Sequence, residues 1–297
     1  MDIESKLELI KKNTEEIITL EEVIKEIENK TSPVTYCGYE PSGPLHLGHM
    51  ITVTKLRDLE EAGFKVIILL ADLHARLNLK GSSQEIKEQC LIWEKAMKSL
   101  GLKRPEIVLG SSFQLKPEYW EDFMMLATKT TMNRSLRAMQ EIARDIENAK
   151  ISQVMYPLMQ INDIKHLGVD VTEAGLEQRK IHMLGREIMQ YIDYKPPTCV
   201  HTPLITSLTG PGSKMSSSIP DSNISVIDPE KEIIRKVKKA YCPEGIVEEN
   251  PVLQLARLVV FPRTNSLIIE RKPKFGGDIE FADYDSLEQA FVKKELH

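Results

Sequence analysis

Two short motifs, at residues 46–49 and 214–218, contain the residue types that bind and polarise ATP phosphates. His46 and His49 are three residues apart, so on a helix both imidazoles lie on one face and can point at the same phosphate group. Between them, Gly48 has no side chain and lets a flat base approach the backbone. The alternative is that the histidines only cap a helix or face water. The spacing and the intervening glycine favour phosphate binding.

The first motif stands at the start of a predicted helix. It follows an extended stretch, residues 34–39, and a Pro41-Ser42-Gly43 turn, and it opens an amphipathic run that continues to residue 61. The first turn of such a helix presents unpaired N–H groups and the positive end of the helix dipole, which attract anions. We expect the phosphates of ATP there.

The second motif lies in a Gly- and Ser-rich segment, residues 210–218, whose composition predicts a flexible loop. Mobile glycines would let Lys214 swing in after ATP arrives and neutralise charge on the leaving pyrophosphate. The hydroxyls of the three serines that follow Met215 are further donors. Solvated linkers often have the same composition, so this segment alone supports little.

A polar stripe on an otherwise apolar helical pattern indicates the second substrate. Tyr156, Gln160 and Asp163 recur at i, i+4 and i+7 and therefore share one face. Asp163 can accept a hydrogen bond from a phenolic hydroxyl, with Tyr36 as a second partner. Tyr156, Gln160 and Gln178 can hold an α-ammonium. The alternatives are a helix cap or surface acid for Asp163 and a core aromatic for Tyr156, but three polar residues at this spacing, with Gln178 opening the next helix, favour a binding site.

Strand-like and helix-like segments alternate up to about residue 204. The strands are expected at residues 34–39, 66–71, 107–109 and 199–204, and the helices at residues 46–62, 83–100, 118–143 and 177–192. Continuous apolar runs indicate strands buried on both faces, as in a parallel sheet covered by helices. The predicted fold class is therefore α/β, a Rossmann-like doubly wound parallel sheet. Ligands of such sheets bind beyond the carboxyl ends of the strands, at the switch point.

The pattern changes to helices after about residue 225, with helices expected at residues 229–241 and 251–260. We predict a catalytic domain at residues 1–224, with a helical insert near residues 118–144. A smaller, mainly helical domain would occupy residues 225–297, with the Lys214 segment at the junction.

Composition excludes several classes of protein. A net charge of −5 and a pI near 5.9 do not suggest a DNA-binding protein, so any contact with nucleic acid must be local. The four scattered cysteines form no Cys-x-x-Cys pair, which argues against a zinc site or a disulfide framework, and we expect them to be buried. No apolar run approaches the about 20 residues that cross a bilayer. We expect a cytoplasmic protein without membrane contact.

Together the two phosphate motifs resemble the signature sequences of class I aminoacyl-tRNA synthetases. The resemblance continues along most of the chain and is closest to a tyrosyl-tRNA synthetase of the archaeal and eukaryotic type. It is carried by Tyr36-Cys37-Gly38-Tyr39-Glu40-Pro41-Ser42-Gly43, Leu69-Leu70-Ala71-Asp72-Leu73-His74, residues 156–163, Glu177-Gln178-Arg179-Lys180-Ile181-His182 and Lys274-Phe275-Gly276-Gly277-Asp278.

This resemblance implies roles for individual residues. The tyrosine-binding residues would be Tyr36, Leu69, Ala71, His74, Gln114, Tyr156, Gln160, Asp163 and Gln178. The ATP-binding residues would be Gly38, Glu40, Pro41, Ser42, Gly43, Gly48, Met215 and Ser218. The catalytic residues would be His46, His49, Lys214, Ser216 and Ser217. The tRNA-binding residues would be Arg134, Arg137, Phe275 and His297.

The implied reaction has two steps. The tyrosine carboxylate attacks the α-phosphorus of ATP in line and expels pyrophosphate, and the terminal ribose hydroxyl of tRNA(Tyr) then attacks the tyrosyl-adenylate. No covalent enzyme intermediate is needed, so catalysis consists of alignment and charge neutralisation. Mg²⁺ would accompany ATP, no resident metal is expected, and the resemblance implies a homodimer through the helical insert.

The sequence departs from the family pattern in three places. Ile219-Pro220-Asp221 follow the serines where relatives commonly have Lys-Gly-Asn, so activation could be slower. Asn133, Ser135 and Leu136 interrupt the arginines of the acceptor-stem helix. Relatives continue past the position of His297 with Pro-x-Asp and a terminal helix, so either the sequence is truncated or anticodon reading is weakened.

Three other functions remain open from the sequence. A tryptophanyl-tRNA synthetase shares the scaffold and the ATP motifs. A catalytically weak synthetase-like protein could bind tRNA or sense tyrosine. A small-molecule adenylyltransferase could use a similar His-x-x-His motif, although the distant Lys214 segment and the helical second domain argue against it.

Overall fold

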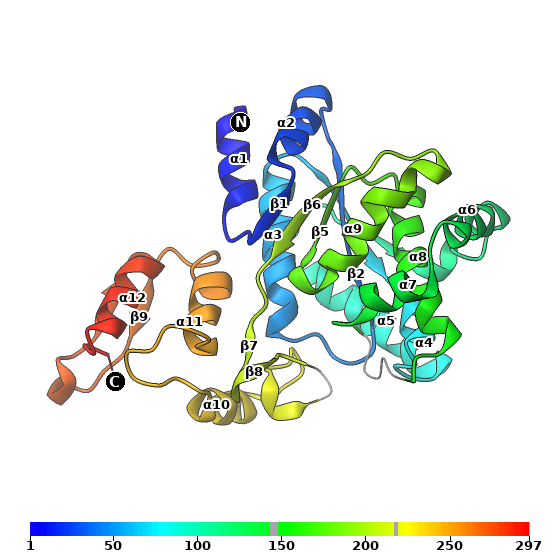
Figure 1. Cartoon of the computed structure of the whole chain (residues 1–297). Coiled ribbons are helices and arrows are strands. Elements are labelled where there is room, and N and C mark those ends of the chain that lie inside the picture. The colour runs from blue at the N-terminus through cyan, green and yellow to red at the C-terminus, as the bar shows by residue number, and fades with distance from the viewer. Residues whose placement is uncertain (143–147, 217–218, 297) are drawn as a thin grey trace. The chain divides into compact units, whose positions relative to one another are not determined.

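The computed structural model describes residues 1–142, 148–216 and 219–296 (Figure 1). The chain divides into two compact units. The first contains Met1–Gly43 and Lys55–Pro203, and the second contains Pro44–Thr54 and Leu204–His297. The first phosphate motif thus belongs to the second unit, although Lys55–Pro203 of the first unit separate it from the rest of that unit in the sequence. The roles predicted for the two domains stay predictions.

A six-stranded sheet in the order β1-β6-β5-β2-β3-β4 lies at the centre of the first unit. Its strands are β1 (Glu16–Ile18), β2 (Val34–Tyr39), β3 (Lys65–Leu70), β4 (Glu106–Leu109), β5 (Val171–Gly175) and β6 (Thr198–Thr202). Only β1 is antiparallel to its neighbour among these strands. The predicted Rossmann-like α/β fold is therefore confirmed.

Helices lie on both faces of this sheet (Figure 1). They are α1 (Ile3–Lys11), α2 (Leu20–Asn29), α3 (Met50–Glu61, shared with the second unit), α4 (Asp72–Leu77), α5 (Ser83–Ser99), α6 (Pro117–Thr128), α7 (Met132–Met139), α8 (Ile151–His166) and α9 (Arg179–Ile188). The predicted helix at 118–143 is interrupted, because Thr131 caps a new helix by accepting from the backbone N–H of Arg134. Its last predicted residue, Ala143, lies outside the described residues.

The switch point of the sheet lies at β2. This strand pairs with β3 on one side and with β5 on the other, so the chain order reverses there. The turn that follows β2 is anchored by Trp93 of α5, which is buried and donates from Nε1 to the carbonyl oxygen of Gly43 at 2.7 Å. The structure thereby places a fixed turn at the edge where ligands of such sheets bind.

The second unit combines helices with two small antiparallel sheets. Its elements are β7 (Thr206–Ser207), β8 (Gly210–Lys214), α10 (Glu230–Lys239), α11 (Pro251–Leu255), β9 (Leu267–Ile269), β10 (Ile279–Phe281) and α12 (Tyr284–Val292), with a π-helical turn at Ala256–Val260. The loop predicted at 210–218 is wrong in its first half, since Lys214 pairs with Thr206 in the β7–β8 hairpin. Gly210 and Gly212 have positive φ angles, which glycine adopts easily, so this glycine-rich segment can turn and still pair as a strand.

Two predictions from composition can be checked within the described residues. Cys37, Cys90 and Cys199 are buried free thiols as expected, whereas Cys242 is exposed. None of the helices described is both long and apolar enough to span a bilayer.

Candidate active site

A cavity of about 400 Å³, including open solvent at its mouth, lies at the switch point of the first unit. All the residues predicted to bind tyrosine line it, except Gln114. Gly38 and Glu40, which were predicted to contact ATP, line the same cavity. The pattern did not single out three further lining residues, Glu173, Ala174 and His182.

One end of the cavity holds a carboxylate that is only half satisfied. Asp163 of α8 is fully buried, and its Oδ1 accepts hydrogen bonds from Gln114 Nε2 at 2.8 Å and from the hydroxyl of Tyr119 at 2.7 Å. Its Oδ2 has no hydrogen-bond partner among the described residues. His74 Nε2, 3.6 Å away, has none either. Buried polar atoms normally have partners, so these two atoms indicate a place for a ligand hydroxyl.

Tyr36 supplies a neutral hydroxyl near this carboxylate. Burial, and then the negative charge of Asp163, raise the pKa of Tyr36 well above its ordinary value. Burial likewise raises the pKa of Asp163, although His74 and the hydrogen bonds from Gln114 and Tyr119 oppose this effect. A neutral phenol and a carboxylate acceptor can both hydrogen-bond a ligand hydroxyl. Sequence reasoning missed Tyr119 because it reaches Asp163 from α6, 44 residues earlier.

The opposite side of the cavity carries a second polar group. Tyr156 donates from its hydroxyl to Glu40 Oε1 at 2.5 Å, and Glu40 Oε2 lies 2.7 Å from Lys80 Nζ. Burial opposes ionisation of Glu40, but the Lys80 charge prevails and lowers the pKa of this carboxyl. Gln160 donates to Gln178 Oε1 at 3.2 Å, which joins α8 to the start of α9. Together these residues present oxygen acceptors suited to an ammonium group.

In the second unit, both motif histidines cap the turn in which they lie. The predicted helix at residue 46 begins as a 3₁₀ turn, Leu47–His49, before α3. His46 Nδ1 accepts from the N–H of Gly48 at 3.1 Å, and His49 Nδ1 accepts from the N–H of His46 at 3.1 Å. Burial lowers the pKa of His46 to about 4, so this ring is neutral at neutral pH. Capping and phosphate binding are compatible here, because a ring that accepts at Nδ1 carries its proton at Nε2.

Gly48 is required by packing within the motif. A Cβ at this position would lie 2.8 Å from His46 Cε1 and 3.3 Å from the Cβ of Met215. Any larger residue would therefore displace the His46 ring from its capping position. This reason differs from the approach of a base that the sequence suggested.

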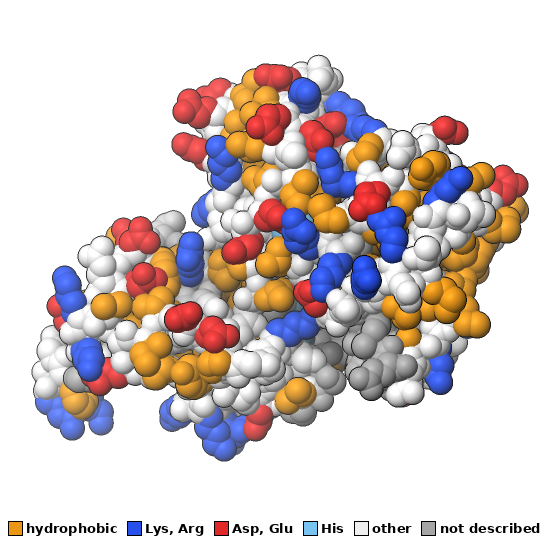
Figure 2. All heavy atoms as spheres, viewed as in Figure 1, with side chains coloured by type: hydrophobic (Ala, Val, Ile, Leu, Met, Phe, Trp, Pro, Cys, Tyr) orange, Lys and Arg blue, Asp and Glu red, His pale blue; other side chains and the backbone are white. Residues whose placement is uncertain are grey.

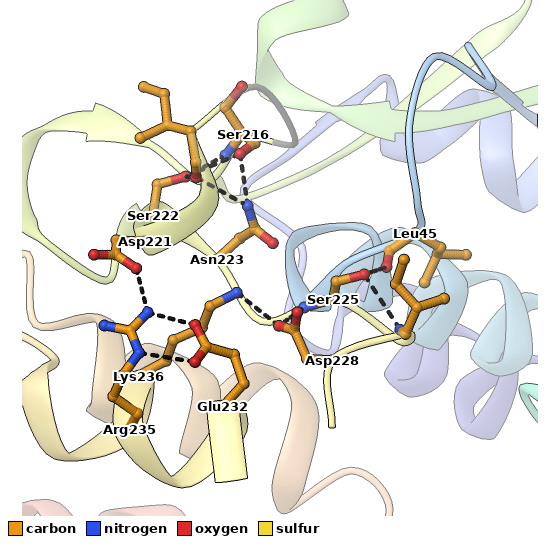
Figure 3. Close-up of polar contacts among 12 residues, drawn as sticks. Leu45, Ser216, Asp221, Ser222, Asn223, Ser225, Asp228, Glu232, Arg235 and Lys236 are labelled. Atoms are coloured by element: carbon orange, nitrogen blue, oxygen red, sulfur yellow. Dashed lines mark hydrogen bonds and ion pairs between the residues drawn. The ribbon is translucent and has the colours of Figure 1, made fainter. Parts of the chain in front are cut away.

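Hydrogen bonds inside the second unit join the region of the first phosphate motif to residues 224–225, which follow the second motif. The N–H of Leu47 donates to the carbonyl of Ile224 at 2.9 Å. Figure 3 shows a neighbouring bond, in which Ser225 Oγ donates to the carbonyl of Leu45 at 3.3 Å. The carbonyl of Ser216 accepts from Ser222 Oγ at 2.9 Å, which anchors the segment after Lys214. Two predicted residues of this motif, Ser217 and Ser218, lie outside the described residues.

The substituted residues after the serines form their own contacts. Asp221 pairs with Arg235 of α10, which also pairs with Glu232, and Lys236 of α10 lies 2.7 Å from Asp228 Oδ2 (Figure 3). The basic residues that Figure 3 labels are thus held by acidic neighbours.

The residues predicted to contact tRNA belong to different units. Arg134 and Arg137 are on α7, where Arg134 pairs with Glu187. Phe275 ends a 3₁₀ turn in the second unit, is 47% exposed and carries Lys274 Nζ 4.8 Å above its ring. His297 lies outside the described residues.

A buried carboxyl group on β5 is protonated rather than charged. Burial raises the pKa of Glu173 to about 8, with Cys37, Lys55 and Thr202 opposing the shift and Glu177 adding to it. Its Oε1 accepts from Thr202 Oγ1 at 3.4 Å, and its Oε2 has no hydrogen-bond partner among the described residues.

The chain is similar to known proteins in both sequence and structure. Residues 28–297 match the family of tRNA synthetases class I (W and Y). The tyrosine–tRNA ligase of Archaeoglobus fulgidus is 50% identical over 299 residues, covering 100% of this chain and 92% of that protein. The tyrosine–tRNA ligase of Methanopyrus kandleri is 48% identical, again covering 100% of this chain and 92% of that protein. The crystal structure of the A. fulgidus tyrosyl-tRNA synthetase complexed with L-tyrosine superposes with a TM-score of 0.95 at 49% identity, covering 100% of this chain and 92% of that one.

The protonated state of Glu173 predicts a pH-dependent stability. Because its pKa is raised from 4.5 to about 8 by folding, the native state binds the proton more tightly than the unfolded chain, and stability falls as pH rises from about 4.5 to 8. Glu173→Gln removes this titration. The thermal midpoint of the variant relative to the unsubstituted protein should therefore rise from pH 5 to pH 8 in a calorimetric series. A difference that stays constant over this range would contradict a protonated Glu173.

Proposed function

This chain belongs to the class I tRNA synthetases for tryptophan and tyrosine, and we propose that it activates L-tyrosine with ATP and transfers the tyrosyl group to tRNA(Tyr). The carrying observation is the Asp163 carboxylate, which is fully buried with Oδ2 lacking a partner among the described residues. The phenolic hydroxyl of tyrosine is a suitable donor for this oxygen. Phenylalanine would leave the oxygen unpaired, at a cost of about 1–3 kcal/mol.

The amino-acid end of the substrate faces the other polar group of the cavity. Tyr156, Gln160 and Gln178 would accept hydrogen bonds from the α-ammonium, and the apolar walls at Leu69 and Ala71 would contact the ring. The tryptophan alternative is not favoured, because an indole has no hydroxyl for this site and the relatives that match the whole chain at about half identity are tyrosine–tRNA ligases.

The phosphate motifs of the second unit would act on ATP. His46 and His49 would donate from Nε2 to phosphate oxygens, since capping already occupies Nδ1 of each ring. Lys214, with the serines that follow Met215, would neutralise the charge on departing pyrophosphate. The tyrosine carboxylate is the nucleophile, so these groups need only align the α-phosphate and stabilise the developing charge.

Mg²⁺ is proposed as part of the ATP substrate rather than as a resident ion. Magnesium in such reactions is commonly held by substrate phosphates with few protein ligands. Among the described residues, the one group of three converging potential metal ligands is His182, Cys199 and His201, in the unit that does not carry the phosphate motifs.

For tRNA, we propose the contacts predicted from the resemblance. Arg134 and Arg137 would approach the acceptor stem, and Phe275, with His297, would approach the anticodon. A protein that charges tRNA for translation would work in the cytoplasm.

A homodimer through α6 and α7 is also proposed. Met124 and Met125 of α6 are 58% and 45% exposed, and Leu115 and Met132, which flank this helix, are more exposed still. Figure 2 shows hydrophobic side chains gathered over the α6 region. An apolar surface of this kind usually marks an interface.

The tyrosine site is tested by Asp163→Ala in tyrosine-dependent exchange of pyrophosphate into ATP. We expect the preference for tyrosine over phenylalanine to fall about 10- to 100-fold, because the variant no longer has a carboxylate that only a hydroxyl can satisfy. Asp122→Asn is the matched control. Asp122 of α6 pairs with Lys165 and His166, which lie on α8 like Asp163, and it does not line the cavity. An unchanged preference in Asp163→Ala would refute the assignment.

The phosphate site is tested by His49→Ala and Lys214→Ala. Each should lower kcat of the exchange reaction by about 100- to 1,000-fold, as loss of one transition-state donor does elsewhere. Tyrosine affinity, measured by calorimetry, should hardly change, because the residues that line the tyrosine cavity lie in the other unit. Lys231→Ala, on an exposed face of α10, serves as control. Full activity in both variants would contradict these roles.

The dimer is tested by the double substitution Met124→Glu and Met125→Glu. Light scattering should give about twice 33.8 kDa for the unsubstituted chain and 33.8 kDa for the variant, because two carboxylates per helix oppose burial of this surface. Ile268→Glu, at another exposed apolar position in the second unit, should remain dimeric. A monomeric unsubstituted chain would sink the proposal.

A further inference from the structure

A chain of hydrogen bonds runs from the surface of the first unit to the wall of the tyrosine cavity. Arg179 Nε donates to both carboxylate oxygens of Glu16, at 2.8 and 3.0 Å. Glu16 Oε2 lies 3.0 Å from His201 Nδ1, and His201 Nε2 lies 2.9 Å from His182 Nδ1. His182 lines the cavity. We call this chain the Glu16–His201–His182 relay.

The fold holds each member of the relay in place. Glu16 of β1 stands directly opposite His201 of β6 in the sheet register, and His182 comes from α9, which lies beside these strands (Figure 1). The two imidazole rings are stacked with centroids 5.1 Å apart, and both residues are at most 1% exposed. The hydrogen bonds and the packing therefore hold both rings in one orientation.

The direction of the hydrogen bonds follows from chemistry. A carboxylate only accepts, so His201 Nδ1 must carry a proton that it donates to Glu16. In a neutral ring, His201 Nε2 then carries no proton and accepts a hydrogen bond from the N–H at Nδ1 of His182. The second nitrogen of His182, Nε2, is consequently an unprotonated acceptor. Burial, and then the neighbouring His201, lower the pKa of His182 to about 3, and burial also lowers the pKa of His201, so both rings are neutral.

From this geometry we infer that His182 Nε2 accepts a hydrogen bond from the α-ammonium of the bound amino acid, with Glu16 and His201 as positioning residues that fix its tautomer. This inference rests on the proposed function. Because Nδ1 bonds His201, Nε2 is the ring nitrogen of His182 that remains for a ligand in the cavity. His182 also follows Gln178 by one helical turn, on the side where Gln160 and Gln178 meet.

A buried neutral acceptor suits this ligand chemically. A cationic imidazole would repel an ammonium, and an Nε2–H tautomer would present a donor to a group that only donates. The relay excludes both states before the amino acid arrives, so no proton has to move on binding. His182 Nε2 then joins the oxygens of Tyr156, Gln160 and Gln178 as an acceptor available to the three N–H groups of the ammonium.

A metal ion is the competing occupant of this cluster. The ligand atoms of His182, Cys199 and His201 lie within 4.8 Å of one another. However, the Cys199 thiol contacts the carbonyl of Pro197 at 3.5 Å, and burial raises its pKa to about 11, whereas zinc binds the thiolate. The two ring nitrogens also already share one proton at hydrogen-bond distance.

The functional test compares tyrosine with its des-amino analogue, 3-(4-hydroxyphenyl)propionic acid. His182→Leu should raise KM for tyrosine about 10- to 100-fold with little change in kcat, and should leave the inhibition constant of the analogue unchanged, because only tyrosine carries the ammonium. His182→Gln, which retains an acceptor oxygen, should restore part of the affinity. Glu16→Ala should shift KM in the same direction by a smaller factor.

Glu22→Gln is the matched control. The carboxylate of Glu22, on α2, accepts from Arg186, which lies on α9 like His182, at 2.8 and 2.9 Å, and it belongs to no bond of the relay. It should leave the preference for tyrosine over the analogue unchanged. If the unsubstituted protein performs tyrosine-dependent exchange but His182→Leu weakens tyrosine and the analogue equally, this inference fails while the proposed function stands. If no tyrosine-dependent exchange occurs, the proposed function itself fails.

A spectroscopic test reads the tautomer directly. In protein labelled with ¹⁵N-histidine, His182 should show a protonated Nδ1 and a bare Nε2, and Glu16→Ala should redistribute this population. Observation of the Nε2–H tautomer in the unsubstituted protein would overturn the inference. So would about one equivalent of zinc per chain in purified protein by elemental analysis, if His182→Leu removed it.

Discussion

The proposed tyrosine site depends on the buried carboxylate of Asp163, whose Oδ2 has no hydrogen-bond partner among the described residues. Helix α6 and the turn before it bring Tyr119 and Gln114 to the other oxygen, Oδ1, where both donate hydrogen bonds. Burying a carboxylate costs free energy unless both oxygens are hydrogen-bonded. A ligand hydroxyl that donated to Oδ2 would remove this cost. The packing of α6 against α8 therefore supports the proposed tyrosine site, although the sequence suggested a role for neither Tyr119 nor Asn162, which donates to the Tyr119 carbonyl.

Burial also decides which other groups near the ligands carry charge. It keeps His46 and His182 neutral and Glu173 protonated, while Glu40 remains ionised because Lys80 compensates its burial. Each neutral imidazole is then fixed in one tautomer by a hydrogen bond at Nδ1. In His46 that nitrogen accepts and in His182 it donates, so Nε2 is a donor in His46 and an acceptor in His182, which suits the proposed contacts with phosphate and with an ammonium.

The sequence predicts those parts of the site that depend on local periodicity. The spacing of Tyr156, Gln160 and Asp163 places them on one face of α8, and the apolar runs locate β2 and β3 closely. It does not reveal β5, because Glu173 and Gly175 interrupt the apolar pattern of a strand that is nevertheless buried throughout. Partners such as Tyr119 for Asp163 and His201 for His182 escape notice because only tertiary folding brings them together.

The proposed reaction requires little of the protein beyond donors and acceptors that are already in position. The nucleophile is the carboxylate of the substrate, so no side chain has to be activated, and the useful contribution of the fold is to hold donors and acceptors in place before the substrates arrive. The capped histidines, the paired oxygen of Asp163 and the relay behind His182 all meet that requirement in the same way. In His46, Asp163 and His182, a hydrogen bond made within the protein occupies one atom of a buried group, and the other polar atom of that group is the one proposed to meet the ligand.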